Sequence, residues 1–285
     1  MSTVWSFKQE LVGVFGHPVA ENPTQVMIEA AFTEMGLDWR YLTVEVRPED
    51  LGPAVRGAKA MNWMGFNLTI PHKVAVLDHL DRLSPAAVMI GAVNCVINQA
   101  GEWFGDNTDG KGFLQAVQEV RSIKGARVAL LGAGGAARAI GVELALAGAA
   151  HLTVVNRDVH RGQLLTKLIR DRTGVPTNFV TWEGMYPVSE GTDVVVNATS
   201  IGLYPDVEAR VPIDPQTLTS DIIVCDVIPN PPRTWFIREA ERKGCRVIDG
   251  LEMLVNQGVI GIRLWTGKEP SPRVMRSALE SVFQP

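Results

Sequence analysis

Short apolar runs alternate along this chain with longer segments in which apolar residues recur every three or four positions. The first pattern is typical of buried strands and the second of amphipathic helices. In the first third we expect strand–helix pairs at 11–15 and 24–35, 41–46 and 48–60, and 66–70 and 72–83. Such alternation predicts an α/β fold with a parallel or mixed sheet.

A second series of the same kind begins near Gly125. Its expected strands are 127–131, 152–155, 193–196, 222–226 and 246–248, and its expected helices are 136–147 and 161–172, which end at Gly148 and Gly174. This order is typical of a Rossmann-like unit. From Gly250 onward, apolar residues at helical spacing predict one further helix.

A glycine-rich loop joins the first strand and helix of the second series. It reads Gly132-Ala133-Gly134-Gly135-Ala136-Ala137-Arg138. In a GxGxxA fingerprint the first glycine permits the turn, the second lets the backbone approach a pyrophosphate, and the helix amides bind the charge. We therefore expect this loop to bind a dinucleotide; the alternative is an ordinary strand–helix turn.

The end of the next strand bears on the choice of cofactor. NAD enzymes usually carry an acidic residue there for the ribose 2′-hydroxyl, whereas this chain reads Asn156-Arg157-Asp158-Val159-His160-Arg161. Arg157 and Arg161 suit a 2′-phosphate, which favours NADP, with NAD as the alternative because Asp158 would repel a phosphate. The arginines could also be a solvated helix start.

Composition narrows the class of partner. Of 285 residues, 46% are apolar and 20% charged, with a net charge of −4 and no sustained basic stretch, so a small-molecule substrate is expected rather than nucleic acid or a membrane. The three cysteines and five histidines show no metal-ligand spacing. The N-terminus lacks the pattern of a signal peptide, and no apolar run approaches the about 20 residues of a membrane span. We therefore expect a cytoplasmic protein without a metal.

Two polar motifs interrupt apolar sequence: Asn67-Leu68-Thr69-Ile70-Pro71-His72-Lys73 and Asn107-Thr108-Asp109-Gly110. With Pro71 as the first helical residue, Lys73 would lie in the first turn, where the helix dipole lowers its pKa, while a nearby Asp109 would raise it. Such a pair suits proton transfer near neutral pH. The alternative is a solvated lysine and a helix-capping aspartate.

On these motifs the chain resembles the shikimate dehydrogenase family, including its quinate-using paralogues, from about residue 13 to 267. The shared stretches, in order, are GFNLTIPHK, GAVNCV, GDNTDGKGF, GAGGAAR, VVNR, VVNATSIGL and DGLEMLVNQG. The resemblance implies a substrate-binding and catalytic domain of residues 1–108 and 250–285, an NAD(P)-binding Rossmann domain of residues 109–249, and a homodimer.

The resemblance also implies roles for single residues. Lys73 and Asp109 would lie beside a ring hydroxyl or ketone during reversible hydride transfer to or from nicotinamide. Other matching positions would bind substrate hydroxyls (Asn67, Thr69, Asn94 and Gln257) or border the nicotinamide (Thr199, Ser200 and Met253). Without the resemblance, Asn94 and Ser200 could equally be turn residues.

The chain departs from the family around the substrate. The usual pair of serines that holds a carboxylate is replaced by Asn22 and Thr24, Pro229 stands in place of a tyrosine, and Glu252 in place of a glycine. We expect an enzyme acting on shikimate, quinate or a related cyclic hydroxy acid, with shikimate itself a poor substrate.

Two alternatives remain open. Asn22 and Pro23 could simply be the N-cap and first residue of a helix. The whole chain could be a catalytically idle, nucleotide-binding regulatory paralogue, although retention of both Lys73 and Asp109 argues against that reading.

Overall fold

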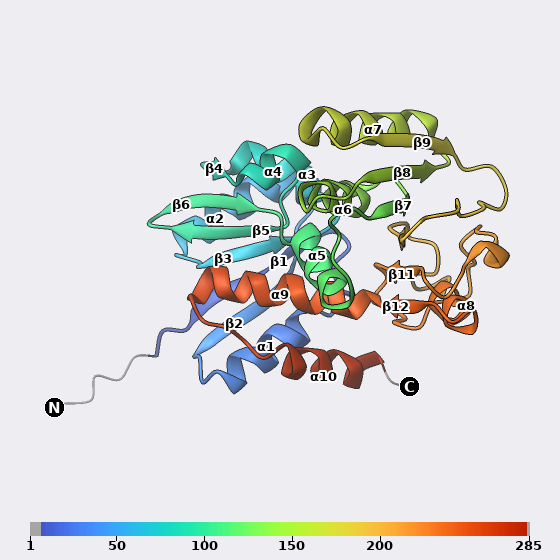
Figure 1. Cartoon of the computed structure of the whole chain (residues 1–285). Helices are drawn as coiled ribbons and strands as arrows, with labels where there is room; N and C mark the ends of the chain where they lie inside the picture. Colours follow the sequence, from blue (N-terminus) through green and yellow to red (C-terminus); the bar gives the residue numbers. More distant parts are fainter. Residues whose placement is uncertain (1–6, 284–285) are drawn as a thin grey trace. The chain divides into compact units, whose positions relative to one another are not determined.

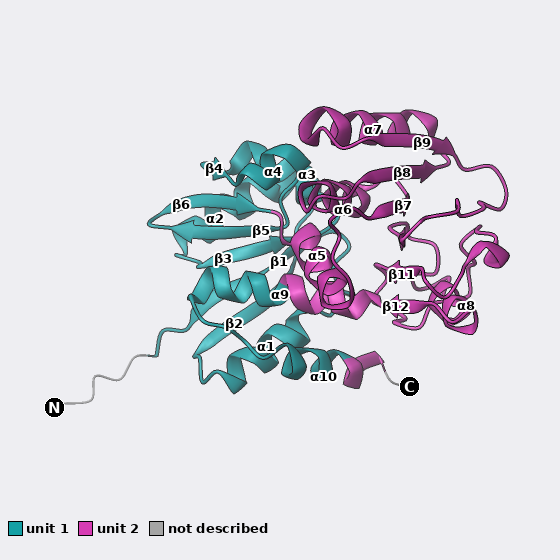
Figure 2. Cartoon of the chain, in the orientation of Figure 1, with its two compact units in different colours: residues 1–106, 258–279 teal, residues 107–257, 280–285 magenta. Residues whose placement is uncertain are grey.

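The structure is a computed structural model that describes residues 7–283 (Figure 1). The chain divides into two compact units (Figure 2). Unit 1 comprises residues 1–106 and 258–279, and unit 2 comprises residues 107–257 and 280–285. The predicted assignment of substrate and cofactor to separate domains stays a prediction at this point.

Unit 1 contains a six-stranded mixed sheet with the order β2-β1-β3-β5-β6-β4. Strand β1 is parallel to β2 and β3, whereas β5 runs antiparallel to both β3 and β6. The strands are β1 (Glu10–Gly16), β2 (Trp39–Glu45), β3 (Gly65–Leu68), β4 (Arg82–Leu83), β5 (Cys95–Gln99) and β6 (Glu102–Asp106). The helices of its N-terminal part are α1 (Thr24–Glu34), η1 (Pro48–Asp50), α2 (Leu51–Ala60), α3 (His72–Ala75), η2 (Val76–His79) and α4 (Pro85–Ile90).

Aromatic side chains fill part of the core of unit 1. Phe66 stacks on Phe15 with ring centroids 4.7 Å apart and meets Trp103 edge-on at 5.2 Å. Trp63 lies against Phe15 in the same cluster. These rings bury large apolar areas and hold the middle of the sheet, from which the polar end of β3 emerges.

The helix predicted over residues 72–83 is wrong beyond its first two turns. The backbone is already extended at Leu80, and β4 follows. The cause is a tertiary contact: Asp81 donates its N–H to the Trp103 carbonyl (3.0 Å), and its carboxylate accepts from the Trp103 N–H (2.6 Å). Pairing with β6 therefore overrides the local helical pattern.

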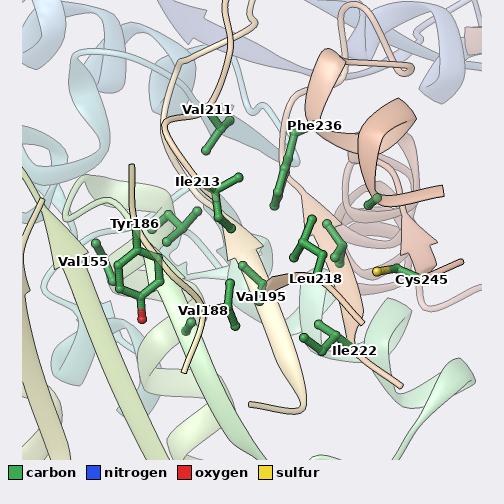
Figure 3. Close-up of a cluster of buried hydrophobic side chains, with 14 of the residues drawn as sticks. Val155, Tyr186, Val188, Val195, Val211, Ile213, Leu218, Ile222, Phe236 and Cys245 are labelled. Atoms are coloured by element: carbon green, nitrogen blue, oxygen red, sulfur yellow. The ribbon is translucent and has the colours of Figure 1, made fainter. Parts of the chain in front are cut away.

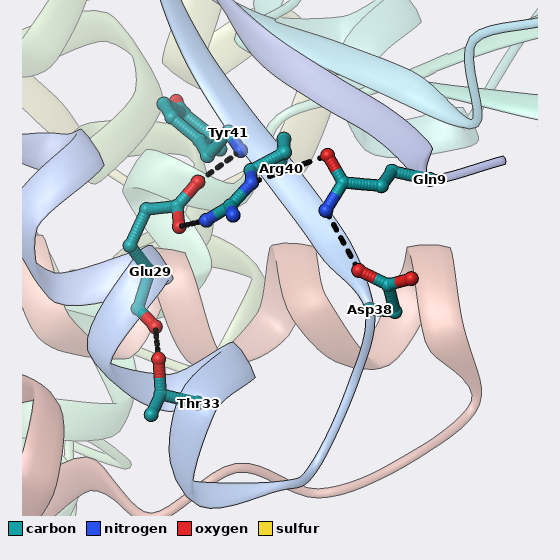
Figure 4. A network of polar contacts seen from close by, with 6 residues as sticks. All are labelled: Gln9, Glu29, Thr33, Asp38, Arg40 and Tyr41. Carbon is teal, nitrogen blue, oxygen red and sulfur yellow. Dashed lines mark hydrogen bonds and ion pairs between the residues drawn. The ribbon is translucent and has the colours of Figure 1, made fainter. Parts of the chain in front are cut away.

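A polar network joins α1 to the edge strand β2 (Figure 4). One Glu29 oxygen accepts from the Tyr41 backbone N–H (2.6 Å), and the other pairs with Arg40 (3.2 Å). Gln9 links Arg40 to Asp38. An edge strand exposes unpaired backbone donors to other chains, and here the Glu29 carboxylate takes up one of them.

Unit 2 contains a six-stranded sheet with the order β12-β11-β10-β7-β8-β9, in which every pairing is parallel. The strand order reverses between β7 and β10, as in a Rossmann fold. The strands are β7 (Arg127–Leu131), β8 (His151–Asn156), β9 (Thr177–Thr181), β10 (Val194–Asn197), β11 (Ile223–Asp226) and β12 (Arg246–Ile248). The intervening helices are α5 (Thr108–Val120), α6 (Gly135–Leu146), α7 (Val159–Thr173), η3 (Pro215–Thr217) and α8 (Trp235–Arg242). The predicted α/β fold is confirmed.

The segment between β9 and β11 adds a second apolar layer to unit 2 (Figure 3). Tyr186, Val211 and Ile213 are buried there with Phe236 of α8. The Trp182 indole N–H donates to the Pro212 carbonyl (2.8 Å), which ties two parts of this segment together. Apart from β10 and η3, this described segment forms neither strands nor helices, so the sequence pattern does not reveal the layer.

The C-terminal region is helical: α9 (Gly250–Thr266) confirms the predicted helix, and α10 (Pro272–Phe283) follows it. Residues 250–257 of α9 belong to unit 2 and the remainder to unit 1. Within residues 7–283, no helix combines the length and apolarity needed to cross a membrane. Cys95, Cys225 and Cys245 are buried free thiols, and burial raises the pKa of Cys225 and Cys245.

Candidate active site

Lys73 is held near the polar end of β3 in unit 1. It is the second residue of α3, is partly buried, and accepts the Val93 N–H at its backbone carbonyl (2.8 Å). The prediction that Pro71 begins this helix is wrong by one position: Pro71 is the N-cap and His72 the first helical residue. With only four residues, α3 aligns too few peptide dipoles to act strongly on Lys73.

His72 explains why this short helix is fixed. Its side chain is 1% exposed, and its Nε2 lies 2.7 Å from the Val46 carbonyl, just beyond β2. The His72 N–H also donates to the Thr69 carbonyl (2.9 Å). These contacts anchor the turn that carries Lys73.

Asn67, Thr69 and Asn94 lie close together in unit 1, as their shared predicted role requires. Asn67 is in β3, donates from Nδ2 to the Asn94 carbonyl (3.0 Å) and accepts from the Tyr41 hydroxyl (2.7 Å). Asn67 and Asn94 are buried, and Thr69 is partly exposed beyond β3. Sequence reasoning missed Tyr41, because a tyrosine in an apolar strand gives no signal of a polar task.

Asn22 and Thr24 lie at the start of α1. The Asn22 Oδ1 accepts the Thr24 backbone N–H (3.0 Å), although the N-cap position is Pro23, so the exact capping arrangement predicted from the sequence is one residue out of place. Within the described chain, the Asn22 Nδ2 and the Thr24 hydroxyl have no hydrogen-bond partner. Both groups can therefore donate to a ligand.

Asp109 lies at the N-terminus of α5 in unit 2. Asn107 caps this helix by accepting the Gly110 N–H (3.4 Å), and Asp109 is the acidic residue of the first turn, where the helix dipole favours a negative charge. The neighbouring Thr108 is fully buried and donates to Gln257 Oε1 of α9 (3.5 Å). Unit 2 thus brings the Asp109 turn and Gln257 onto adjacent helices.

The glycine-rich loop connects β7 to α6 and has the shape expected of a pyrophosphate cradle. Gly132 has φ of 110°, and a Cβ there would lie 2.9 Å from the Ala198 carbonyl. Gly134 and Gly135 are exposed, and a Cβ at either would meet no atom within 4 Å. Gly134 caps α6 without a side chain, so the helix amides stay open to an anion.

Asp158, which appeared unfavourable for a phosphate, is the N-cap of α7. Its carboxylate accepts the Arg161 N–H (3.0 Å), and its carbonyl accepts from Asn156 Nδ2 (2.8 Å). Arg161 Nε lies 3.8 Å from the same carboxylate. Arg157 is exposed and makes no hydrogen bond or ion pair with any other described residue. Its guanidinium is therefore available for a phosphate.

A buried network holds the loop after β10. Asn197 donates to Asp226 (3.0 Å) and accepts from the Thr199 hydroxyl (2.6 Å), and Asp226 also accepts from the Thr234 hydroxyl (2.7 Å). Burial raises the pKa of Asp226 to about 6, against these hydrogen bonds, which lower it. Sequence reasoning missed this network; its only signal is a polar residue ending each of two apolar strands.

The remaining predicted residues are also in unit 2. Ser200 is exposed beside Thr199, and Met253 is 9% exposed on α9. A Cβ at Gly132 would also approach the Thr199 side chain, so the glycine loop and the loop after β10 are neighbours. Within residues 7–283 no cluster of three or more His, Cys, Asp or Glu side chains is arranged to bind a metal.

Three sequence families match successive parts of the chain. Residues 14–96 match "Shikimate dehydrogenase substrate binding domain", residues 115–216 match "Shikimate / quinate 5-dehydrogenase", and residues 250–280 match "Shikimate 5'-dehydrogenase C-terminal domain". A shikimate dehydrogenase (NADP(+)) of Methanothermobacter thermautotrophicus is 38% identical over 276 residues, which is 97% of this chain and 98% of that protein. The relative from Methanopyrus kandleri with the same name is 41% identical over 94% of both chains.

Solved structures show the same likeness. The ligand-free 5-ketofructose reductase of a Gluconobacter strain is 51% identical, has a TM-score of 0.94, and is matched over 98% of this chain and 100% of its own. A shikimate dehydrogenase in complex with NADP+ is 34% identical (TM-score 0.91; 99% and 98% covered). The Listeria monocytogenes shikimate 5-dehydrogenase with shikimate and NAD is 30% identical (TM-score 0.89; 98% and 99% covered).

Proposed function

Because this chain belongs to the shikimate dehydrogenase family and is therefore an NAD(P)-dependent oxidoreductase, we propose a specific substrate class for it. That class is an uncharged polyhydroxy ketone, of which 5-ketofructose is the representative. The single observation that carries the proposal is the 51% identity to 5-ketofructose reductase along the whole chain, against 36–41% for the curated shikimate dehydrogenases.

The start of α1 supports this choice. The family pattern has two serines that hold a carboxylate at this place. This chain has Asn22 instead, and its amide oxygen already accepts a hydrogen bond from the Thr24 backbone N–H. The groups left over are one amide N–H₂ and one hydroxyl, which suit the neutral oxygens of a sugar.

We propose NADP(H) as the cofactor. The open glycine loop suits the pyrophosphate, and Arg157, which has no ion-pair partner within residues 7–283, suits a ribose 2′-phosphate. Relatives named for NADP(+) and a related structure containing NADP+ support the same choice, although another relative was solved with NAD. Under this proposal unit 2 contributes the cofactor site and unit 1 most of the substrate site, as in the predicted domains with boundaries near residues 108 and 250.

Reduction of a ketone needs a hydride at the carbonyl carbon and a proton at its oxygen. The bound reduced nicotinamide supplies the hydride. In the proposed mechanism the Lys73 ammonium donates its proton to the carbonyl oxygen, which becomes the new hydroxyl, and Lys73 then regains a proton from water. Asp109 stabilises the ammonium form of Lys73. The reverse reaction uses neutral Lys73 as the base.

Shikimate is the second candidate substrate. Curated relatives at 36–41% identity are named shikimate dehydrogenase (NADP(+)). The motif resemblance implies substrate-site roles for Lys73, Asp109, Asn67, Thr69, Asn94 and Gln257. The comparisons offer no support for an idle regulatory paralogue. Action in the cytoplasm accords with the three free thiols, and homodimerisation stays a prediction.

The test is a steady-state comparison of two reactions, NADPH oxidation with 5-ketofructose and NADP+ reduction with shikimate. We expect kcat/KM for 5-ketofructose to exceed that for shikimate by at least about a hundredfold. A variant with Asn22→Ser and Thr24→Ser should gain activity on shikimate with little change in stability, since a serine hydroxyl at position 22 can also accept the backbone N–H of residue 24. A wild-type enzyme that prefers shikimate would reject the polyhydroxy ketone.

A further inference from the structure

The Asn67 amide lies in the middle of a buried hydrogen-bond chain in unit 1. Tyr41 of β2 pairs in register with Val12 of β1, and Asn67 of β3 pairs with Val14. Because Val12 and Val14 point to the same face of the sheet, Tyr41 and Asn67 share that face. The Tyr41 side chain reaches across β1, and its hydroxyl lies 2.7 Å from Asn67 Oδ1.

The chemistry of the neighbours fixes which way the Asn67 amide is turned. The Asn94 carbonyl can only accept a hydrogen bond, so the amide group facing it at 3.0 Å must be the N–H₂. The amide oxygen then faces the Tyr41 hydroxyl, which must donate. Burial raises the pKa of Tyr41 well above its ordinary value, so this hydroxyl keeps its proton at neutral pH.

The Tyr41 ring is itself held in place. It is fully buried, and its centroid lies 6.2 Å from that of Trp265, whose indole N–H donates to the Val96 carbonyl (3.0 Å). The Tyr41 backbone is tied to Glu29 through its N–H (Figure 4). The phenol therefore cannot turn away from Asn67 without disturbing the unit 1 core.

We infer that Tyr41 is a positioning residue for substrate recognition: by donating to the Asn67 amide oxygen while the Asn94 carbonyl accepts from Nδ2, it holds the amide in the orientation that offers the second N–H to the substrate. This inference rests on the proposed function and on the role that the family resemblance implies for Asn67, which is to bind a substrate hydroxyl. One amide N–H remains after the bond to Asn94. It selects a substrate oxygen that accepts, such as a ketone or a hydroxyl lone pair.

The test uses Tyr41→Phe, which removes the hydroxyl and keeps the ring, with 5-ketofructose and NADPH as the probe. We expect KM for 5-ketofructose to rise about three- to tenfold, the loss of one aligned hydrogen bond, with kcat changed by less than about twofold. Tyr186→Phe is the matched control, because Tyr186 is a buried tyrosine of unit 2. It should leave KM unchanged.

A double-mutant cycle separates positioning from simple stabilisation. Asn67→Ala should raise KM more than Tyr41→Phe does, and adding Tyr41→Phe to it should raise KM no further. Asn67→Ser replaces Asn67→Ala if the latter does not fold. Melting temperatures of all variants are measured alongside, since a purely structural Tyr41 would lower stability and leave KM alone.

The outcomes distinguish the inference from the proposal beneath it. If Asn67 variants raise KM but Tyr41→Phe does not, or if the two effects multiply in the double variant, the positioning role is overturned. If 5-ketofructose is reduced but Asn67 variants keep a normal KM, Asn67 does not contact the substrate, and the positioning role of Tyr41 is rejected as well. If 5-ketofructose is not reduced at all, the proposed substrate has failed, and the same cycle run with shikimate and NADP+ still decides the role of Tyr41.

Discussion

Lys73 and Asp109 are the residues on which the proposed chemistry depends most directly. Under the proposed mechanism, Lys73→Ala removes the proposed proton donor, and Asp109→Asn removes the carboxylate charge proposed to favour its ammonium form. Either change should lower kcat by about a hundredfold or more, while the affinity for NADPH, measured by fluorescence titration, stays almost unchanged. Normal turnover in both variants would reject the pair.

Arg157 and Asp158 should act on the cofactor in opposite directions. Arg157→Ala should weaken NADPH binding by about 1.5 to 3 kcal/mol, the range for a charge-assisted hydrogen bond, and leave NADH binding nearly unchanged. Asp158→Thr keeps a side chain that can cap α7 and removes a negative charge, so NADPH should bind more tightly. Calorimetric titration of both cofactors measures the effects, and equal losses for NADPH and NADH in Arg157→Ala would contradict the phosphate role.

Single site residues can be predicted from the sequence where a chemically distinctive motif lies between a predicted strand and a predicted helix. The glycine loop could be located because a strand precedes it and a helix follows it, and the structure has that arrangement. Asp158 could not be interpreted, because a carboxylate reads the same in a sequence whether it repels a phosphate or caps a helix. Tyr41 could not be found at all, since its partner Asn67 is two strands away in the sheet.

Among the elements, the crossing of α5 and α9 within unit 2 is unusually close. A Cβ on Gly112 would lie 2.6 Å from the Gln257 backbone nitrogen, so Gly112→Ala must separate the two helices. We expect a loss of about 1 to 3 kcal/mol in the free energy of unfolding, together with a raised KM because Gln257 moves. Gly57→Ala in α2 is the control: its Cβ would meet nothing within 4 Å, and stability should rise by about 0.5 to 1 kcal/mol. Denaturant unfolding compares the two, and equal effects would show that the close crossing does not matter.

The buried carboxyl of Asp226, at the end of β11, should make the stability of the protein depend on pH. Burial raises the pKa of Asp226 from 3.8 to about 6. The protonated carboxyl therefore contributes to the free energy of unfolding fully below pH 3.8, and this contribution is lost as the pH rises through about 6. The loss for this group is on the order of 3 kcal/mol, from about two pKa units. Asp226→Asn should lack this dependence, so the difference in unfolding free energy between wild type and variant should change between pH 4 and 7. A constant difference would contradict the raised pKa.

Element prediction failed where long-range pairing outweighed local pattern. The residues that follow His79 carry helical spacing but join the sheet through the Asp81–Trp103 contacts. The β5–β6 hairpin went unpredicted although Asn98 accepts the Gly101 N–H in its turn and Gly101 has φ of 90°. The turn residues are Ala100 and Gly101. This pair does not predict a hairpin turn, because Ala100 takes a positive φ that alanine rarely adopts.

Because the molecule consists of two compact units, bound NADPH should stabilise one unit more than the other. If NADPH binds the glycine loop and Arg157, it stabilises unit 2 by mass action, by about 2.7 kcal/mol at a hundred times its Kd. Hydrogen exchange should slow in β7, α6 and β8 more than in the strands of unit 1. Slowing confined to residues 7–106 would place the cofactor elsewhere.

The three buried thiols have a practical consequence for following this protein in solution. All three are enclosed, and the pKa values of Cys225 and Cys245 are raised, so the native chain should react slowly with maleimide dyes. A cysteine introduced at Met61 in unit 1 and another at Met185 in unit 2, both more than half exposed, would then be the preferred attachment sites. Energy transfer between two such fluorophores would measure the distance between the units with and without cofactor. The native cysteines would not have to be removed first.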